Sequence, residues 1–246
     1  MTTFSIGVLC YGDYPDLAQR CLTLLTQTIK PDTVKDLRIC LNQASHTVKS
    51  VVYDLVKKVH REVPVYVHTV EPHAGIIPYK YPIMRMMLHH SFPVQASHWM
   101  WFDDDVYLRL AHSWKDDWLE TLASRIDASS ADYVGYLRGS PAWRPGQIEG
   151  IKQQLWYRNK EIKPARCQFY QGGWWVARTS LLKDWNYPFP QIIHNGGDTM
   201  LGQLAYQQEW TWLTLDEKYG PVIADFEKRR GDTTTWPWQV GAPVGT

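Results

Sequence analysis

Hydrophobic positions in the first hundred residues follow two alternating spacings. Short runs of apolar and β-branched residues indicate strands, and segments with an apolar residue every three or four positions indicate helices. Strands are predicted at 4–9, 34–41, 63–70 and 96–102, and helices at 15–28, 46–61 and 81–90. Regular strand–helix alternation predicts an α/β fold in which helices flank a mostly parallel central sheet.

The second half of the chain is less regular. Helices are predicted at 113–124 and 198–208, and strands at 133–137, 169–177 and 210–215. Residues 138–166 combine proline, glycine and basic side chains with weak periodicity, and the tail from Gly231 is expected to drape over the surface. No internal repeat and no clear linker divides the sequence, which favours a single domain over residues 1–246.

Three carboxylates follow the predicted strand at 96–102: Asp103, Asp104 and Asp105. Ligands of parallel α/β sheets gather at the carboxyl ends of the strands, so the triplet marks a candidate site. Adjacent carboxylates repel one another and call for a positive group, and a divalent cation with oxygen ligands would supply it. In an extended segment Asp103 and Asp105 would point to the same side. The alternative interpretation is a helix N-cap or a solvated turn.

Composition narrows the possible partners. The net charge of +1 provides no global attraction to nucleic acid or membranes, so such binding would need a local basic patch. No stretch is long and apolar enough to span a bilayer, and the N-terminus lacks a signal-peptide pattern, so we expect an unanchored cytoplasmic protein, in the host cytoplasm if viral.

The four cysteines form no C-x-x-C pair and are expected to be reduced and buried. The 13 tryptophans and 14 tyrosines exceed the needs of a core, so some are expected to line a binding surface.

Three short motifs, in matching order and spacing, resemble those of nucleotide-sugar glycosyltransferases with the GT-A fold. The segment 103–107 (DDDVY) resembles the DxD motif and the acidic motif of Fringe-type enzymes. The segment 172–178 (GGWWVAR) resembles their glycine-rich acceptor-side segment, and 197–202 (GDTMLG) resembles the motif that carries the catalytic base. The N-terminal half also resembles the inverting glycan synthases. The resemblance covers roughly 4–215 and implies a Rossmann-like GT-A domain, with a nucleotide-sugar-binding half at 1–107 and an acceptor-binding half at 108–246.

The resemblance also implies a donor site that binds a nucleotide sugar, expected to be UDP-linked, together with Mn²⁺ or Mg²⁺ bridging the diphosphate oxygens. Asp105 would hold the metal most directly, and Asp103 or Asp104 would contact the ribose, or the metal through water. Many GT-A enzymes add a C-terminal histidine ligand, but no histidine follows His194 here. His194, Asp225 or water would fill that position. Otherwise Asp105 and the diphosphate alone would hold the metal, or the enzyme would be partly metal-independent.

The ends of the first two predicted strands correspond to the nucleotide-binding edge of related enzymes. Tyr11 could stack on uracil, Asp13 could accept a ring N–H, and Asn42 could contact the base or the ribose. Ordinary turn chemistry explains the same residues equally well.

Asp198 is the candidate general base of an inverting reaction, because the resemblance places it where a base would remove the proton of the acceptor hydroxyl. The alternative is a helix N-cap, since Gly196-Gly197-Asp198 is a natural capping sequence. The two roles are compatible.

The glycine-rich segment supplies the candidate acceptor-binding residues. Gly172 and Gly173 would allow close backbone approach to a ligand, or form a plain turn. Trp174 and Trp175 would point to opposite sides of a strand, so either ring could stack on a sugar or pack in the core. Arg178 could bind a phosphate or be a solvated residue at the start of a helix, which the resemblance implies after this segment.

Basic and aromatic residues are interleaved from Arg138 to Arg178, and 228–230 forms a second basic cluster. This mixture suits a polyanion with stackable faces, such as a hydroxymethylated DNA base modified by some phage enzymes. A lipid-linked or surface glycan is the other candidate acceptor, and a solvated surface loop is the simpler interpretation of these basic residues.

Other classes of protein fit the sequence less well. A nucleotidyltransferase or dehydrogenase would need a glycine-rich loop that is not found here. A non-catalytic carbohydrate- or nucleic-acid-binding module would leave Asp103, Asp105 and Asp198 without a task. The oligomeric state is not predicted.

Overall fold

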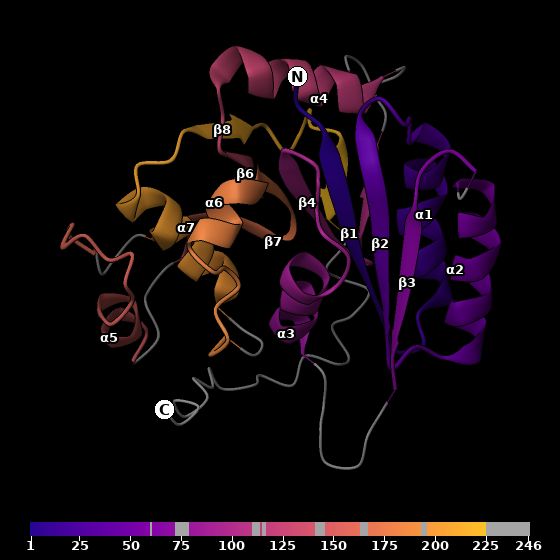
Figure 1. Cartoon of the computed structure of the whole chain (residues 1–246), viewed down its shortest axis with the longest axis horizontal. Coiled ribbons are helices and arrows are strands. Elements are labelled where there is room, and N and C mark those ends of the chain that lie inside the picture. Colours follow the sequence, from indigo (N-terminus) through magenta and orange to yellow (C-terminus); the bar gives the residue numbers. More distant parts are fainter. Residues whose placement is uncertain are drawn as a thin grey trace.

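The structure is a computed structural model and describes residues 1–59, 61–71, 79–109, 114, 117–140, 146–162, 167–192 and 196–224. Its centre is a seven-stranded sheet of order β3-β2-β1-β4-β7-β6-β8 (Figure 1). In that order the strands are Val65–Val70, Val34–Asn42, Phe4–Tyr11, His98–Asp103, Cys167–Arg178, Tyr133–Ser140 and Trp212–Leu215. All pair in parallel except β7, which runs antiparallel to both β4 and β6. The predicted mostly parallel sheet is therefore confirmed.

Helices cover the sheet, as Figure 1 shows. Helices α1 (Pro15–Thr28) and α2 (His46–Val59) lie side by side next to β1, β2 and β3 (Figure 1). Helix α7 (Gly197–Gln207) packs against β7. The remaining helices are α3 (Lys80–Arg85), its π-helical continuation η1 (Met86–His90), α4 (Trp118–Ser129), α5 (Gln147–Lys152) and α6 (Thr179–Asp184). No helix in the described part of the chain is long and apolar enough to cross a membrane.

Successive side chains of the central strands enter different hydrophobic clusters because strand residues alternate between the two faces of a sheet. Phe102 and Trp174 belong to one buried cluster, and Trp101 and Trp175 belong to the other. The cysteine prediction also holds for Cys10, Cys21 and Cys40, which are buried and form no disulfide.

Several predicted elements differ in their boundaries. The helix predicted at 113–124 is found as α4 at Trp118–Ser129, because its buried stripe runs on to Ile126 beyond the polar Arg125. Helix α5 was not predicted, whereas α6 directly follows the segment 172–178, as the resemblance implied. The small antiparallel pair of β5 (Val106–Leu108) and β9 (Val222–Ala224), whose members are far apart in sequence, was not predicted either. The tail from Gly231 lies outside the described residues.

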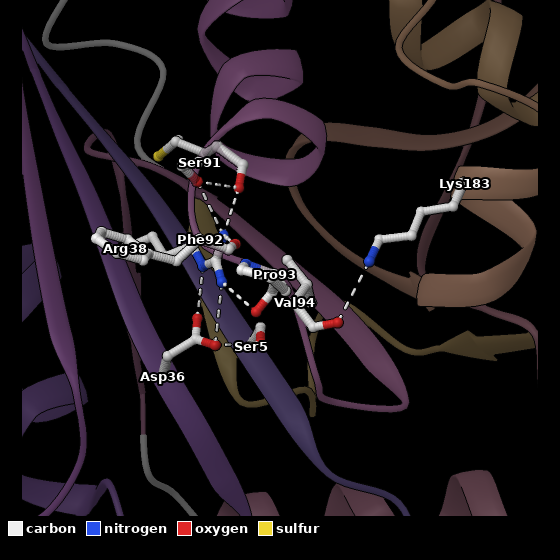
Figure 2. A network of polar contacts seen from close by, with 9 residues as sticks. Ser5, Asp36, Arg38, Ser91, Phe92, Pro93, Val94 and Lys183 are labelled. Atoms are coloured by element: carbon white, nitrogen blue, oxygen red, sulfur yellow. Dashed lines mark hydrogen bonds and ion pairs between the residues drawn. The ribbon is translucent and has the colours of Figure 1, made fainter.

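A buried arginine fastens the end of η1 to the sheet (Figure 2). Arg38 on β2 is fully buried, and its Nε lies 2.7 Å from Asp36 Oδ1. The guanidinium also donates to the carbonyl oxygens of Met87, Phe92 and Pro93 at 2.6, 2.7 and 3.2 Å. A buried charge is tolerated only when it is paired and hydrogen-bonded in this way. Because α3 runs directly into η1, the same anchor holds the start of α3 near the carboxyl ends of the central strands.

Candidate active site

The acidic triplet lies at the carboxyl end of β4. Asp103 ends β4, and Asp104 and Asp105 form the turn before β5. The prediction that Asp103 and Asp105 point to the same side assumed an extended segment. That assumption is wrong, because Asp104 and Asp105 form a turn. Asp104 is 1% exposed, and its Oδ2 accepts the backbone N–H of Tyr11 at 2.9 Å. Asp104 thus ties the end of β4 to the end of β1.

Asp103 has a cationic partner that the sequence analysis missed. The Lys80 ammonium, on the first residue of α3, lies 2.6 Å from Asp103 Oδ2 and donates to the Gly172 carbonyl oxygen, also at 2.6 Å. The other Asp103 oxygen accepts the indole N–H of Trp101 at 2.9 Å. A positive group among the carboxylates was expected from their mutual repulsion, but the structure places an ammonium there. Nothing in the sequence near Lys80 distinguishes it from any other lysine at a helix start.

Asp198 lies opposite, in the first turn of α7. Its Oδ1 accepts the backbone N–H of Thr199 at 3.0 Å, and its own N–H donates to Tyr81 Oη at 3.0 Å. The N-cap position belongs to Gly196, so the interpretation of Asp198 as the N-cap is wrong, although its side chain does bind a first-turn amide. Two glycines permit this approach: a Cβ on Gly197 would overlap the Tyr81 ring, and a Cβ on Gly172 would lie 3.2 Å from Asp198 Oδ2.

These contacts bring Lys80, Asp103, Gly172 and Asp198 together, and we refer to them as the carboxylate–lysine cluster. The same Cβ on Gly172 would lie 3.5 Å from Lys80 Nζ, so the open side of Gly172 faces both the ammonium and Asp198. Burial raises the pKa of Asp198, the Asp103 charge adds to this rise, and the Lys80 charge opposes it. Burial also raises the pKa of Tyr81 well above its usual range, followed by the effect of the Asp198 charge, so Tyr81 stays a neutral phenol.

The three residues predicted to bind the nucleotide share the edge of the sheet that carries the cluster. Tyr11 pairs with Asn42 across β1 and β2, and Leu9 pairs with Asp103 across β1 and β4. Gly12 has a φ of +64° and begins the turn that presents the exposed Asp13. Tyr11 is partly exposed, whereas Asn42 is 2% exposed. The described geometry therefore gathers Tyr11, Asp13 and Asn42 beside the acidic turn.

Three predicted acceptor residues do not reach this edge. Trp174 is 0% and Trp175 is 1% exposed, so both rings pack in the core on opposite faces and neither can stack on a ligand. Arg178 pairs with His98 at the other end of β4, where its Nε bonds Asp132 Oδ1 at 2.6 Å. The prediction of a stacking wall is therefore wrong, and Arg178 lies away from the cluster at the start of α6, in agreement with its interpretation as a helix-start residue. Gly172 is part of the cluster, and Gly173 follows it on β7.

The predicted metal ligands do not form a protein metal site in the described residues. The Asp103 carboxylate is held by Lys80 and Trp101, and one Asp104 oxygen binds the backbone of β1. Asp105 is 8% exposed. Among the described residues there is no group of three or more histidine, cysteine, aspartate or glutamate side chains that could hold a metal ion. His194 and Asp225 lie outside the described residues.

On the predicted polyanion surface Arg138, Lys160 and Arg178 each pair with an acidic residue, whereas Lys152 and Arg158 are exposed. Arg138 lies 2.9 Å from Glu217, and Lys160 lies 2.6 Å from Glu209. Such pairing reduces the net charge that these side chains present to a polyanion. Arg144, Lys163, Arg166 and the cluster at 228–230 lie outside the described residues.

Comparison with known proteins shows the fold. No protein-family model matches the sequence, and no curated protein is significantly similar to it. The structure is similar to S. aureus TarS 1–349, with a TM-score of 0.56 and 17% identity over 92% of this chain and 62% of that one. For the same fragment in complex with UDP-GlcNAc the TM-score is 0.53, with 16% identity over 90% of this chain and 58% of that one. For the Pyrobaculum calidifontis mannosyltransferase PcManGT, in complex with GDP-Man and Mn²⁺, it is 0.55, with 13% identity over 88% and 55%.

This chain therefore spans less than two thirds of the length of each of these structures. At such low identity the similarity is one of fold, and the chain has the GT-A fold expected from its motifs.

Proposed function

We propose that this protein is a glycosyltransferase that moves a sugar from a nucleotide sugar to an acceptor hydroxyl. The observation that carries the proposal is the carboxylate–lysine cluster, which lies at the ligand-binding edge of a GT-A sheet and brings the Asp103 and Asp198 carboxylates close to the Lys80 ammonium. Structures of the same fold, TarS 1–349 and PcManGT, were solved with UDP-GlcNAc and GDP-Man. Nucleotide sugars are therefore the ligand class to test first.

The proposed donor is a UDP-sugar held by residues 1–107. Tyr11, Asp13 and Asn42 lie together at the ends of β1 and β2, next to Asp104, and form the proposed nucleoside subsite. The partly exposed phenol of Tyr11 can stack on a base, and Asp13 can accept a ring N–H. Asp103 lies one strand further along and would contact the ribose or the sugar-phosphate portion of the donor.

Asp198 is the proposed general base, with residues 108–246 forming the acceptor half. Its carboxylate would take the proton of the acceptor hydroxyl while that oxygen bonds to the anomeric carbon. The bond between the anomeric carbon and the diphosphate breaks in the same step, so the nucleoside diphosphate leaves with the electron pair and the configuration inverts. A raised pKa makes Asp198 a stronger base once it is ionised, because proton-transfer catalysis improves as the pKa approaches the working pH.

The acceptor is proposed only as a hydroxyl compound. Acidic partners reduce the charge that Arg138 and Lys160 offer to DNA, while Lys152 and Arg158 are exposed, so experiment has to separate a glycan from a hydroxymethylated DNA base. Loss of binding to duplex DNA as salt rises would favour DNA, since phosphate contacts release counterions. The Mn²⁺ or Mg²⁺ ion implied by the motifs stays a prediction, because the described residues contain no group of three or more candidate ligands for it.

A thermal-shift panel of nucleoside diphosphates and nucleotide sugars would test the ligand class, since a ligand that binds only the folded state raises the melting temperature. Turnover then separates an enzyme from a binding module: a transferase releases nucleoside diphosphate from its nucleotide sugar, slowly to water and faster with an acceptor. A shift without any release would indicate a non-catalytic binding module. The proposed function would be refuted if every nucleotide sugar tested gave no thermal shift and no release of nucleoside diphosphate.

A further inference from the structure

The position of Lys80 has a consequence for how the donor diphosphate is bound. The Lys80 and Asp103 side chains are 15% and 17% exposed, so the pair is mostly buried yet reaches the surface of the site. An ammonium has three N–H donors. Within the described residues two of them bind Asp103 Oδ2 and the Gly172 carbonyl oxygen. One donor is left for an oxygen of a ligand.

The surroundings hold the ammonium in place. Lys80 Nζ lies 5.7 Å from the centre of the Tyr81 ring and 5.9 Å from that of Trp101, within the range of cation–π attraction. The start of α3 is in turn held through η1 by the buried Arg38 network shown in Figure 2. The positive charge is therefore positioned in advance rather than carried on a freely moving side chain.

Charge balance favours this ammonium over a divalent ion at Asp103. Each oxygen of Asp103 already accepts a hydrogen bond, one from Lys80 and one from Trp101, so a metal ion at Asp103 would either be repelled by the adjacent ammonium or displace a mostly buried ion pair. Breaking such a pair leaves an uncompensated charge and costs several-fold more than breaking an exposed one. Lys80 therefore neutralises Asp103 and the Trp101 indole adds a hydrogen bond, so the charge of Asp103 is offset without a metal.

The geometry points to Lys80 as the cation that binds the donor diphosphate, so that nucleotide binding does not depend on a divalent metal. This inference rests on the proposed function. The remaining N–H of Lys80 donates to a non-bridging phosphate oxygen, and the ammonium stabilises the charge of the departing diphosphate. A charge-assisted hydrogen bond of this kind contributes a factor of about 10 to 100 in affinity.

Calorimetric titration of the whole protein with UDP, in excess EDTA and again in Mn²⁺, tests the inference without any variant. We expect equal affinity in the two conditions. Binding seen only with Mn²⁺ would overturn the role of Lys80 while leaving the proposed function intact. Absence of UDP and GDP binding in both conditions would count against the proposed function itself, so the two failures are distinguishable.

Variants then locate the effect on the diphosphate. In EDTA, Lys80→Met should weaken UDP binding about tenfold or more and leave uridine binding unchanged, and Lys80→Arg should restore most of the UDP affinity. Lys57→Met removes a lysine from an exposed pair with Asp54 on α2 and is the matched control, with no change expected. Equal weakening of UDP and uridine by Lys80→Met, or no weakening of either, would refute a diphosphate contact.

Discussion

Gly172→Ala separates the geometry of the carboxylate–lysine cluster from the stability of the fold. The added methyl group would lie 3.2 Å from Asp198 Oδ2 and 3.5 Å from Lys80 Nζ, so the carboxylate has to move by a few tenths of an ångström. Displacement of a reacting group by about 1 Å costs about a hundredfold in rate, so we expect a loss of about tenfold in kcat for sugar transfer. Stability should change by less than about 1 kcal/mol, because the lower entropy of the unfolded chain offsets the crowding.

Gly146→Ala is the control, because it is expected to lower stability without changing kcat. Gly146 has a φ of +80° and open space around its Cα, so alanine there strains the backbone but touches nothing. It should cost about 1 kcal/mol of stability, with kcat unchanged. The assays are nucleoside diphosphate release and chemical denaturation on both variants. Full activity in Gly172→Ala at unchanged stability would refute the claim that Asp198 and Lys80 act from these positions.

Three further predictions concern charged groups. Asp198→Asn should lower kcat by about 10² to 10⁴ while calorimetry finds UDP affinity unchanged, and a small effect on kcat would contradict its role as base. Because burial raises the folded-state pKa of Asp198, the native protein binds more protons than the unfolded chain between the ordinary carboxyl pKa and the raised one. Stability is therefore lost as pH rises through that window, so Asp198→Asn should raise the melting temperature at neutral pH and lose this advantage below the ordinary carboxyl pKa. A lower melting temperature at neutral pH would contradict that sign. Arg38→Met leaves the charge of the buried Asp36 uncompensated and should lower the free energy of unfolding, measured in urea, by about 3–5 kcal/mol. Lys57→Met should lower it by less than about 1 kcal/mol, and equal losses in the two variants would contradict the buried network.

The local patterns predicted most of the sheet because each strand and helix carries its own periodicity. Helix α1 occupies the predicted residues 15–28, and β1 and β2 end within two residues of their predicted ends. The pair β5 and β9 could not be predicted, because short strands far apart in sequence leave no periodic signal. The start of α4 was misplaced because no side-chain cap marks it.

The candidate site was predictable where polar residues directly follow a strand. The acidic turn was found in this way and Asp198 from the resemblance of the motif 197–202, and the structure brings the elements that carry them together through Gly172. Lys80 could not be found, because its contacts with Asp103 and Gly172 join residues 23 and 92 positions away. The distance of Arg178 from the cluster could not be predicted, because sequence spacing does not show that β7 runs antiparallel and carries its end to the opposite edge of the sheet.

The central claim is that the cluster transfers sugar from a nucleotide sugar. Its most direct test is the release of nucleoside diphosphate from a panel of UDP- and GDP-sugars by the wild-type protein and by Asp198→Asn, with Asp54→Asn on the exposed face of α2 as the control. We predict release from at least one donor by the wild type and by Asp54→Asn, and a loss of about 10² or more in Asp198→Asn. Equal release by all three proteins, or no release by any, would contradict the account.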